Sequence, residues 1–282
     1  MTEPLLDVRD VEVRYPGRGL RSKGFLALRG VSLDIREGET VGLVGESGSG
    51  KTTLGRAILG LAPVTSGSIT YRGREISGLP RRQRRTLSDQ IQVVFQDPYS
   101  SLNPSMTIEA ILSEPLTVRG GAGREARDRI AELLDQVALP SDAGRRLPRE
   151  FSGGQRQRIA IARALALEPR LIVCDEAVSA LDLSNQKRIL RLLTEIQEDS
   201  GVSYLFVSHD LAVVRHVSHR VAVMYRGEIV ESGDGDTVTS DPEHPYTRRL
   251  LLAAPVPDPD LQARRRRERA ALAARENHER TV

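Results

Sequence analysis

Eight consecutive residues near the start of the chain have the types and the spacing that phosphate binding requires. They fit the pattern G-x-x-x-x-G-K-[ST] and run Gly45, Glu46, Ser47, Gly48, Ser49, Gly50, Lys51, Thr52. Glycines let backbone N–H groups turn toward phosphate oxygens, because no Cβ stands in the way. Lys51 is placed to reach the β- and γ-phosphates of a nucleotide, and the Thr52 hydroxyl to ligate Mg²⁺. We call residues 45–52 the phosphate loop; the alternative is a glycine- and serine-rich turn that merely begins a helix.

Three other apolar segments end in polar side chains of the kind that act on a bound nucleotide. Gln96 follows the first segment, Asp175 and Glu176 end the second, and His209 follows the third. Open α/β sheets bind ligands at the carboxyl ends of their strands. Asp175 is therefore the expected partner of Mg²⁺, and Glu176 the base that orients or deprotonates water. Gln96 is predicted to touch the metal or the water, and His209 the γ-phosphate; the alternatives are solvated turn carboxylates and a structural histidine.

A second anion site is predicted at Ser152, Gly153, Gly154 and Gln155, which we call the signature segment. Ser152 is a good N-cap for the helix that follows, and two glycines there expose backbone donors. Glycines in a first turn lower helix propensity, so their lack of a side chain is expected to serve another purpose. The phosphate loop already holds one nucleotide, so this site suggests a nucleotide bound to a neighbouring subunit. The alternative is a capped helix with nothing bound.

The predicted strands and helices that must position these residues indicate an α/β fold. Short apolar segments predict core strands at Thr40–Val44, Ile91–Phe95, Leu171–Glu176 and Val202–Val207. A helix over Thr53–Leu59 follows the phosphate loop, with Gly60 as its stop. A small antiparallel sheet is predicted from Leu5–Tyr15, Ala27–Ile35 and a hairpin at Ser66–Gly73. Helices at Ile108–Leu116 and Arg124–Val137 predict an inserted helical lobe.

The remaining segments carry weaker signals. A helix is expected over Gln186–Gln197, and a hairpin joins Arg220–Tyr225 to Glu228–Glu231. The basic stretch Arg81–Arg85 is expected to be a solvated helical face, and Gly233–Pro245 to be rich in turns. Pro255–Asp260 should be extended, and Leu261–Arg280 a frayed helix or a disordered tail.

Composition narrows the class of protein. The chain has 282 residues, of which 39% are hydrophobic and 28% charged, as is ordinary for a soluble globular protein. It has no apolar run long enough for a transmembrane helix, and Met1-Thr2-Glu3-Pro4 does not resemble a signal peptide, so a cytoplasmic location is expected. Cys174 is the single cysteine, which excludes an intramolecular disulfide and a cysteine-only metal cluster. A net charge of +3 is too weak to imply nucleic acid.

Taken in order, these motifs resemble the ATPase subunit of ATP-binding cassette (ABC) transporters over roughly residues 5–235. The matching features are the phosphate loop, Gln96, the signature segment, Asp175-Glu176, the loop Ser179-Ala180-Leu181-Asp182 and His209. The resemblance implies a P-loop NTPase (RecA-like) core with an N-terminal antiparallel β subdomain and an inserted α-helical subdomain at about 97–160. It implies that residues 1–235 form the nucleotide-binding domain. Residues 236–282 would then be a C-terminal extension that is typical of peptide-importer ATPases and ends in a charged tail.

The resemblance also implies a role for each site residue. ATP would contact Tyr15, the whole phosphate loop, Thr53, Gln96 and Asp175. Periodicity alone favours Tyr15 as a half-buried strand residue, but the resemblance makes it the adenine-stacking aromatic. The catalytic set would be Lys51, Gln96, Glu176 and His209, and Mg²⁺ would bind Thr52, Gln96 and, through water, Asp175. A second cassette would present Ser152, Gly153, Gly154, Gln155 and Asp182 to the same ATP.

A finer resemblance is to the bacterial dipeptide/oligopeptide/nickel importer subfamily. It is carried by Gln96–Pro104 and by His244-Pro245-Tyr246-Thr247 with Leu250-Leu251 and Ala254-Pro255. Two departures matter. Many relatives have proline where Ala177 stands, so the turn after Glu176 is expected to be looser. Some relatives carry a C-terminal cysteine cluster for an iron–sulfur centre, which this chain, with Cys174 alone, is not expected to build.

The implied function is ATP hydrolysis that energises an importer, favouring di- or oligopeptides over nickel or another small solute. The implied partners are a second cassette, identical or paralogous, integral permease subunits and, indirectly, an extracytoplasmic solute-binding protein; no nucleic acid is expected. The chain would then act at the cytoplasmic face of the membrane. A soluble ABC ATPase acting on ribosomes or DNA is disfavoured, because such proteins usually have tandem cassettes or a coiled-coil insertion. The loop Asp97–Pro104 and the segment His244–Pro255 disfavour an exporter.

Overall fold

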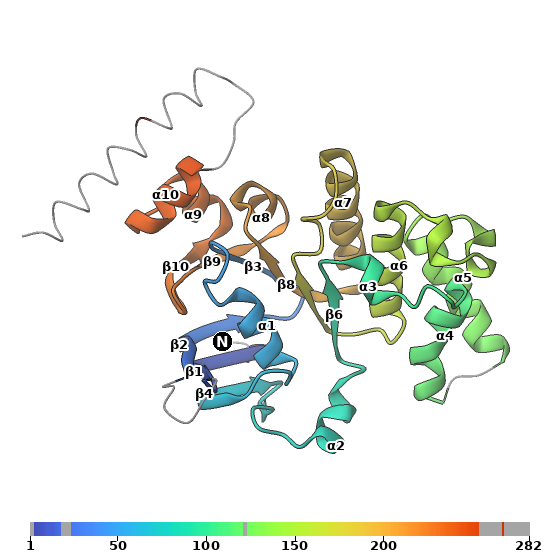
Figure 1. Cartoon of the computed structure of the whole chain (residues 1–282), viewed down its shortest axis with the longest axis horizontal. Helices are drawn as coiled ribbons and strands as arrows, with labels where there is room; N and C mark the ends of the chain where they lie inside the picture. Colours follow the sequence, from blue (N-terminus) through green and yellow to red (C-terminus); the bar gives the residue numbers. More distant parts are fainter. Residues whose placement is uncertain (1–2, 18–23, 121–122, 254–266, 268–282) are drawn as a thin grey trace, which may run out of the picture.

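The computed structural model describes residues 3–17, 24–120, 123–253 and 267, and contains two β-sheets with helices around them (Figure 1). The first sheet is antiparallel, with strand order β2-β1-β4-β5. Its strands are β1 Leu6–Tyr15, β2 Phe25–Ile35, β4 Val64–Tyr71 and β5 Arg74–Glu75. Apolar side chains of β1 such as Leu6, Val8 and Val13 are buried, whereas Arg14 is exposed. The predicted antiparallel sheet is therefore confirmed.

The second sheet has six strands in the order β10-β9-β3-β8-β7-β6, parallel except for β10, which runs antiparallel to β9. The strands are β3 Thr40–Val44, β6 Ile91–Phe95, β7 Leu171–Asp175, β8 Ser203–Ser208, β9 Arg220–Tyr225 and β10 Glu228–Asp234. β3 and β8 are buried along their whole length, as strands covered on both faces should be. The predicted core strand β6 instead lies at the edge, which leaves Phe95 exposed.

Helix α1, Lys51–Ile58, shares one apolar core with both sheets. Its residues Leu54 and Ile58 are fully buried in the cluster that also holds Val8 of β1 and Leu43 of β3. The helix ends where Gly60 adopts a left-handed conformation, with φ of 71°, as predicted. Packing from both sides fixes the direction of α1, and hence the position of Lys51 at its first turn.

The chain between β6 and β7 is mostly helical. It contains α3 Pro98–Ser101, α4 Ile108–Val118, α5 Arg124–Gln136, α6 Gly153–Leu165 and two short 3-10 segments, Ser141–Arg145 and Pro148–Glu150. Ile130, Leu133 and Leu134 of α5 share one face and are buried, as their spacing predicts. These helices join the apolar cluster on the other face of the parallel sheet.

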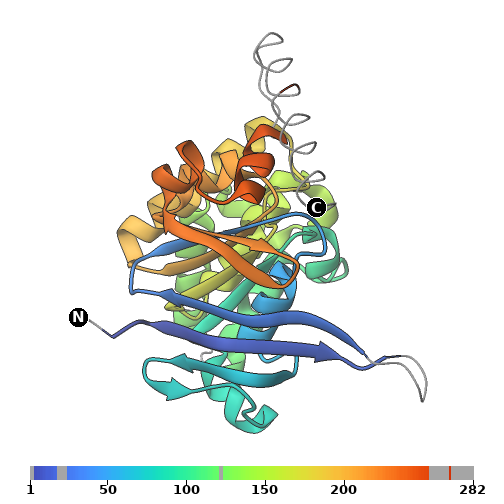
Figure 2. The same ribbon diagram turned by 90° about the vertical axis from the view of Figure 1, so that its left-hand side faces the viewer.

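The C-terminal helices are α7 Leu183–Ser200, α8 Leu211–Val217, α9 Gly235–Ser240 and α10 Pro245–Ala253. The prediction of turns over Gly233–Pro245 was wrong for α9, because the Asp234 carboxylate accepts from the N–H groups of Asp236 and Thr237 and caps that helix. Figure 2 shows α9 and α10 on the side of the parallel sheet away from the antiparallel sheet. The predictions for Pro255–Asp260 and Leu261–Arg280 fall outside the described residues, apart from Arg267.

The basic stretch forms α2, Arg81–Arg84, and the 3-10 segment Arg85–Leu87, and its residue Arg84 departs from the predicted solvated face. The Arg84 guanidinium donates to the carbonyl oxygens of Ile58, at 2.6 Å, and Ile76, at 2.8 Å. Carbonyl groups in the last turn of a helix lack partners within the helix, so a cation there is favourable. Arg84 therefore caps α1 from outside, and its burial lowers the pKa of the guanidinium.

Candidate active site

The phosphate loop connects β3 to α1, and its lysine is folded back on the loop. Lys51 is 5% exposed, and its ammonium donates to the carbonyl oxygens of Gly45, at 2.7 Å, and Glu46, at 2.9 Å. Burial lowers the pKa of Lys51, and the nearby charges of Glu176 and Asp175 act against that shift. A buried ammonium beside two carboxylates is suited to receive a phosphate.

Two glycines of the loop are required by close backbone approach. A Cβ on Gly45 would press against the carbonyl oxygen of Met224 in β9. A Cβ on Gly50 would lie 2.9 Å from the carbonyl oxygen of Ala27 in β2, and Gly50 also has a φ of 112°, which side chains rarely allow. The loop is thus wedged between strands of both sheets.

Asp175 ends β7 and reaches the first turn of α1. The Thr52 hydroxyl donates to its Oδ1 at 3.0 Å. Burial raises the pKa of Asp175, Glu176 adds to the rise through its like charge, and the Thr52 hydrogen bond opposes it. A cation placed here would relieve the cost of ionising this carboxyl, so Thr52 and Asp175 form a set of oxygen donors that suits Mg²⁺.

Glu176 stands one residue further on, in a left-handed backbone conformation with φ of 52°. For a residue other than glycine this is strained, and such strain gathers at functional sites. Its N–H donates to Val207 of β8, while its carboxylate lies 3.6 Å from His209 Nδ1. The turn that follows is held by Ser179, whose N–H and hydroxyl both donate to the Glu176 carbonyl, and Ala177 within it is buried.

A cavity of about 200 Å³ opens beside the phosphate loop. Its lining residues are Phe25, Ala27, Ser47, Gly48, Gly50, Lys51, Thr52, Thr53 and Glu176. Phe25 is 63% exposed and was not singled out from the sequence, although an aromatic residue beside a predicted strand is a usable signal. Tyr15 is half-buried, pairs with Phe25 across β1 and β2, and does not line the cavity.

Gln96 follows β6, at the same carboxyl end of the parallel strands as Asp175 of the neighbouring strand β7 and Glu176 after it. Phe95, the residue before it, pairs with Asp175, so Gln96 leaves β6 where the two carboxylates leave β7. Its side chain is exposed. Buried Gln157 of α6 donates to the Phe95 carbonyl at 3.5 Å, which links the start of the Gln96 loop to the helix of the signature segment.

The signature segment forms a second cluster with Asp182. The Ser152 hydroxyl accepts from the Gln155 N–H at 3.3 Å, and the Gln155 side chain accepts from the Ser152 N–H at 3.0 Å. A Cβ on Gly154 would lie 2.8 Å from the Asn185 side chain, which itself donates to Asp182 at 2.6 Å. The predicted site residues therefore gather in two groups. Lys51, Thr52, Asp175, Glu176 and His209 form one, and residues 152–155 with Asp182 the other, outside the lining of the 200 Å³ cavity.

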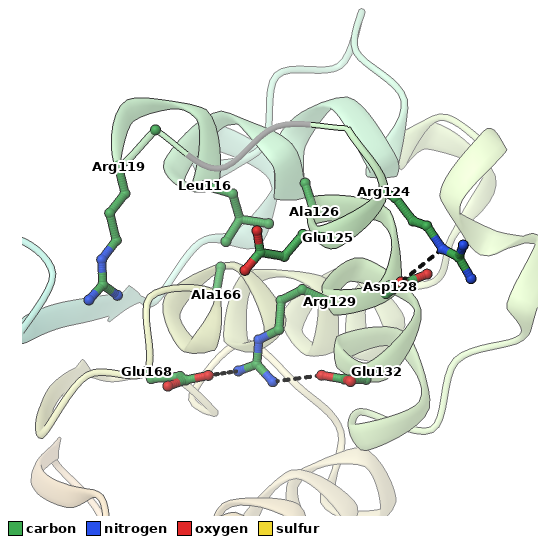
Figure 3. A pocket seen from close by; sticks show the side chains of 11 residues that line it. Leu116, Arg119, Arg124, Glu125, Ala126, Asp128, Arg129, Glu132, Ala166 and Glu168 are labelled. Carbon is green, nitrogen blue, oxygen red and sulfur yellow. Dashed lines mark hydrogen bonds and ion pairs between the residues drawn. The ribbon is translucent and has the colours of Figure 1, made fainter.

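A larger cavity, of about 790 Å³, lies among α4, α5 and the end of α6. Figure 3 shows Arg129 between Glu132 and Glu168, with which it forms ion pairs of 3.2 and 3.7 Å. Its wall contains none of the residues predicted for nucleotide chemistry. Size does not identify the site here, and we take the smaller cavity at the phosphate loop as the candidate active site because the titratable groups converge there.

The sequence of this chain matches a family model and named relatives. Residues 28–179 match the family model described as ABC transporter. The chain is 52% identical over 255 residues to a putative peptide import ATP-binding protein of Brucella abortus, covering 88% of this chain and 75% of that protein. It is 49% identical over 269 residues to the glutathione import ATP-binding protein GsiA of Salmonella typhimurium, covering 94% of this chain but 43% of GsiA. The chain thus spans less than half the length of that second relative.

Solved structures show the same fold. The cbiO1 protein of Clostridium perfringens, described as part of the ABC transporter complex cbiONQ, matches with a TM-score of 0.75 and 27% identity, over 89% of this chain and 96% of that one. The ATP-binding cassette MJ0796, solved as a post-hydrolysis dimer bound to ADP and Pi, matches with a TM-score of 0.73 and 32% identity, over 81% and 98%. The predicted P-loop NTPase fold is confirmed, and the chain belongs to the ABC transporter family.

Proposed function

We propose that this chain is the ATP-hydrolysing subunit of an ABC importer for small peptides. The observation that carries the proposal is the convergence of Lys51, Thr52 and Glu176 on one cavity at the phosphate loop, with Asp175 hydrogen-bonded to Thr52. The names of the relatives support the direction and cargo of transport, since they are described as peptide and glutathione import ATP-binding proteins. Nickel or another small solute is the alternative cargo.

The phosphates of ATP would lie in the phosphate loop. Ser49 supports this assignment, because its hydroxyl is buried without a hydrogen-bond partner. Lys51 would exchange its two carbonyl partners for phosphate oxygens, and the N–H groups at the start of α1 would add their partial positive charge. Phe25 extends the cavity on the side of β2, so we assign the adenine platform to Tyr15 and Phe25 together.

Mg²⁺ would be held by Thr52 and Gln96, with Asp175 acting through water. The hydroxyl and carboxylate oxygens of Thr52 and Asp175 are the donor types that this ion prefers. When bound, the ion would neutralise charge that develops on the phosphates.

Glu176 would act as the general base toward the attacking water. Its carboxylate lies on the cavity wall and beside His209, which would orient the same water and the γ-phosphate. Strain at Glu176 supports a functional role, because the turn around it is held rigidly by Ser179 and Val207.

A complete ATP site would need the signature segment of a second cassette. The signature segment offers backbone donors at the start of α6 but stands outside the cavity of its own chain. We therefore assign Ser152, Gly153, Gly154, Gln155 and Asp182 to the ATP held by a partner cassette, arranged head to tail. The dimer solved for a related cassette supports this arrangement.

The permease would be a separate membrane component. Among residues 3–17, 24–120, 123–253 and 267, no helix has the length and apolarity needed to cross a membrane. We propose that the chain docks on integral permease subunits at the cytoplasmic face, and that an extracytoplasmic solute-binding protein delivers the cargo. We further propose residues 1–235, with a helical insertion at about 97–160, as the nucleotide-binding domain, and 236–282 as its extension.

The test is purification of the tagged chain from its own cells in mild detergent, followed by identification of its partners. Integral permease subunits and a second cassette are the expected companions, and the associated solute-binding protein can then be screened against peptides and metal ions. Recovery of ribosomal proteins or DNA without a membrane partner would instead support a soluble ABC ATPase.

A further inference from the structure

The C-terminal helix α10 reaches back to the phosphate loop. Tyr246, in its first turn, is 2% exposed, and its hydroxyl oxygen accepts a hydrogen bond of 2.9 Å from the N–H of Glu46. The two residues are 200 positions apart in the chain. The sequence singles out Tyr246 only as part of a subfamily motif, with no role attached.

This contact completes the anchoring of one peptide group. The peptide bond between Gly45 and Glu46 has a carbonyl, which accepts from Lys51 at 2.7 Å, and an N–H, which donates to Tyr246. Its plane is therefore held from both ends. The same loop is held at a second point, where the Gly227 N–H of the β9–β10 turn donates to the Ser49 carbonyl at 2.8 Å.

Tyr246 is itself fixed in place. Its ring lies 4.2 Å from the ring of Tyr225 at the end of β9, tilted by 33°. Its N–H donates to His244 Nδ1 at 3.1 Å, and the Glu231 carboxylate of β10 accepts from the N–H groups of Glu243, at 2.8 Å, and His244, at 3.1 Å. A side chain packed and hydrogen-bonded in this way can orient the group that it contacts.

We propose that Tyr246 is a positioning residue for ATP binding, and that helix α10 thereby holds the phosphate loop in its binding conformation. ATP must draw Lys51 away from the Gly45 and Glu46 carbonyls. The Tyr246 hydroxyl then remains as the hydrogen-bond partner of that peptide group and keeps its plane from turning. The inference rests on the proposed assignment of the phosphate loop as the ATP site.

The decisive comparison is between Tyr246→Phe and Tyr225→Phe in the full-length chain. Each variant keeps its ring in the stack and loses one hydroxyl, but only the Tyr246 hydroxyl contacts the loop. ATP affinity is measured by calorimetry with EDTA present, so that turnover is suppressed. Loss of one neutral hydrogen bond predicts about a fivefold weaker affinity for Tyr246→Phe, and less than about twofold for Tyr225→Phe.

A second measurement separates positioning from general damage. Hydrogen exchange of the peptide that contains Glu46 should become faster in Tyr246→Phe and stay unchanged in Tyr225→Phe, while exchange in α4 and α5 stays unchanged in both. In the assembled complex, KM for ATP should rise about fivefold with kcat within about twofold, because Glu176 and His209 are not moved. Glu231→Gln, which weakens the anchor of α10, should shift both measurements in the same direction but less.

Normal ATP affinity and normal exchange in Tyr246→Phe would overturn the inference, as would equal losses in the two tyrosine variants. Lys51→Ala separates this failure from that of the proposed function. If Lys51→Ala abolishes ATP binding while Tyr246→Phe binds normally, only the role of Tyr246 is lost. If Lys51→Ala binds ATP as the wild type does, the assignment of the phosphate loop fails, and the inference fails with it.

Discussion

At the scale of single residues, the candidate site places the ammonium of Lys51 close to the carboxylates of Asp175 and Glu176. Lys51 is buried, and burial lowers its pKa, while burial raises the pKa of Asp175. The charge of Glu176 acts against the lowering of the Lys51 pKa and adds to the raising of the Asp175 pKa. Charged groups that are already buried side by side can act on a bound phosphate without a large rearrangement of the fold, although Lys51 must leave its two carbonyl partners.

Glu176→Gln tests the proposed base directly. The amide has the same shape but accepts no proton, so we expect turnover in the assembled complex to fall about 10²- to 10⁴-fold with ATP affinity retained. The measurement is steady-state phosphate release beside calorimetric ATP binding. Glu198→Gln is the matched control, because Glu198 is exposed on α7, and it should keep wild-type turnover. Turnover within tenfold of the wild type in Glu176→Gln would assign the base to another group.

The positions of the motif residues in the fold were largely predictable at this scale, because most motifs directly follow an apolar segment that predicts a strand. Asp175, Glu176 and His209 were expected at strand ends, and the structure has them there. Phe25 was missed, and Tyr246 was named only as part of a motif, because their contact with the phosphate loop from β2 and from α10 depends on the tertiary fold. Arg84 was misjudged because the basic run Arg81–Arg85 contains three further arginines, and only the tertiary fold shows that Arg84 reaches the Ile58 carbonyl.

At the scale of elements, α1 depends on Arg84 at the end opposite to Lys51. Arg84→Ala leaves the Ile58 and Ile76 carbonyls without their charged donor, and we expect the free energy of unfolding to fall by about 2 kcal/mol. Urea unfolding measures the loss. Arg85→Ala removes an exposed neighbour and should change stability by less than about 0.5 kcal/mol. Equal losses in both variants would mean that Arg84 acts only through net charge.

The order of the strands in the parallel sheet could not be predicted from the sequence. The pattern predicts buried strands but not that β3 lies between β8 and β9, nor that β6 is at the edge. The same holds for α9, whose glycine and aspartates read as turn signals until the Asp234 cap is seen. In both cases long-range contacts or cap geometry decide between local structures of similar free energy.

An ion pair joins the two sheets and gives a pH-dependent prediction at the scale of elements. Arg220, at the start of β9, donates to both carboxylate oxygens of Asp34 in β2, at 3.0 and 3.1 Å. These hydrogen bonds hold the pKa of Asp34 below its usual 3.8. The ionised form is thus favoured in the folded state, so its stabilisation is present above about pH 4 and is lost as pH falls through the lower, folded-state pKa.

Asp34→Asn should therefore lower the free energy of unfolding at pH 7 by about 1 kcal/mol, near the upper end for partly exposed pairs. The difference from the wild type should shrink as pH falls below about 4. Urea unfolding between pH 7 and 3.5 measures it. Asp128→Asn is the control, because Asp128 is 67% exposed and 3.7 Å from Arg124, and it should show no such trend. A difference that grows toward acid pH would contradict the assignment.

At the scale of the whole molecule, the separation of the site residues into two groups leads us to expect that a complete site needs a second cassette. Lys51 and Glu176 line the cavity, whereas the start of α6 stands in a separate cluster with Asn185 and Asp182. A nucleotide can contact both groups if a second cassette presents its own α6 to the cavity. We therefore expect ATP to act as part of the interface between cassettes.

Glu176→Gln provides the background for testing this interface, because slow hydrolysis should let ATP hold two cassettes together. With ATP and Mg²⁺, the variant should elute at the mass of a dimer in light-scattering chromatography, alone or with the cassette that co-purifies. Adding Gly153→Asp places a carboxylate where α6 would receive the γ-phosphate, and repulsion should return the protein to monomer. Gly201→Asp adds the same charge at the far end of α7, where a Cβ has open space. Its φ of 68° makes the substitution cost some stability, so urea unfolding checks that the protein is folded, and the dimer should stay intact. A dimer that survives Gly153→Asp, or that forms equally without ATP, would place the interface elsewhere.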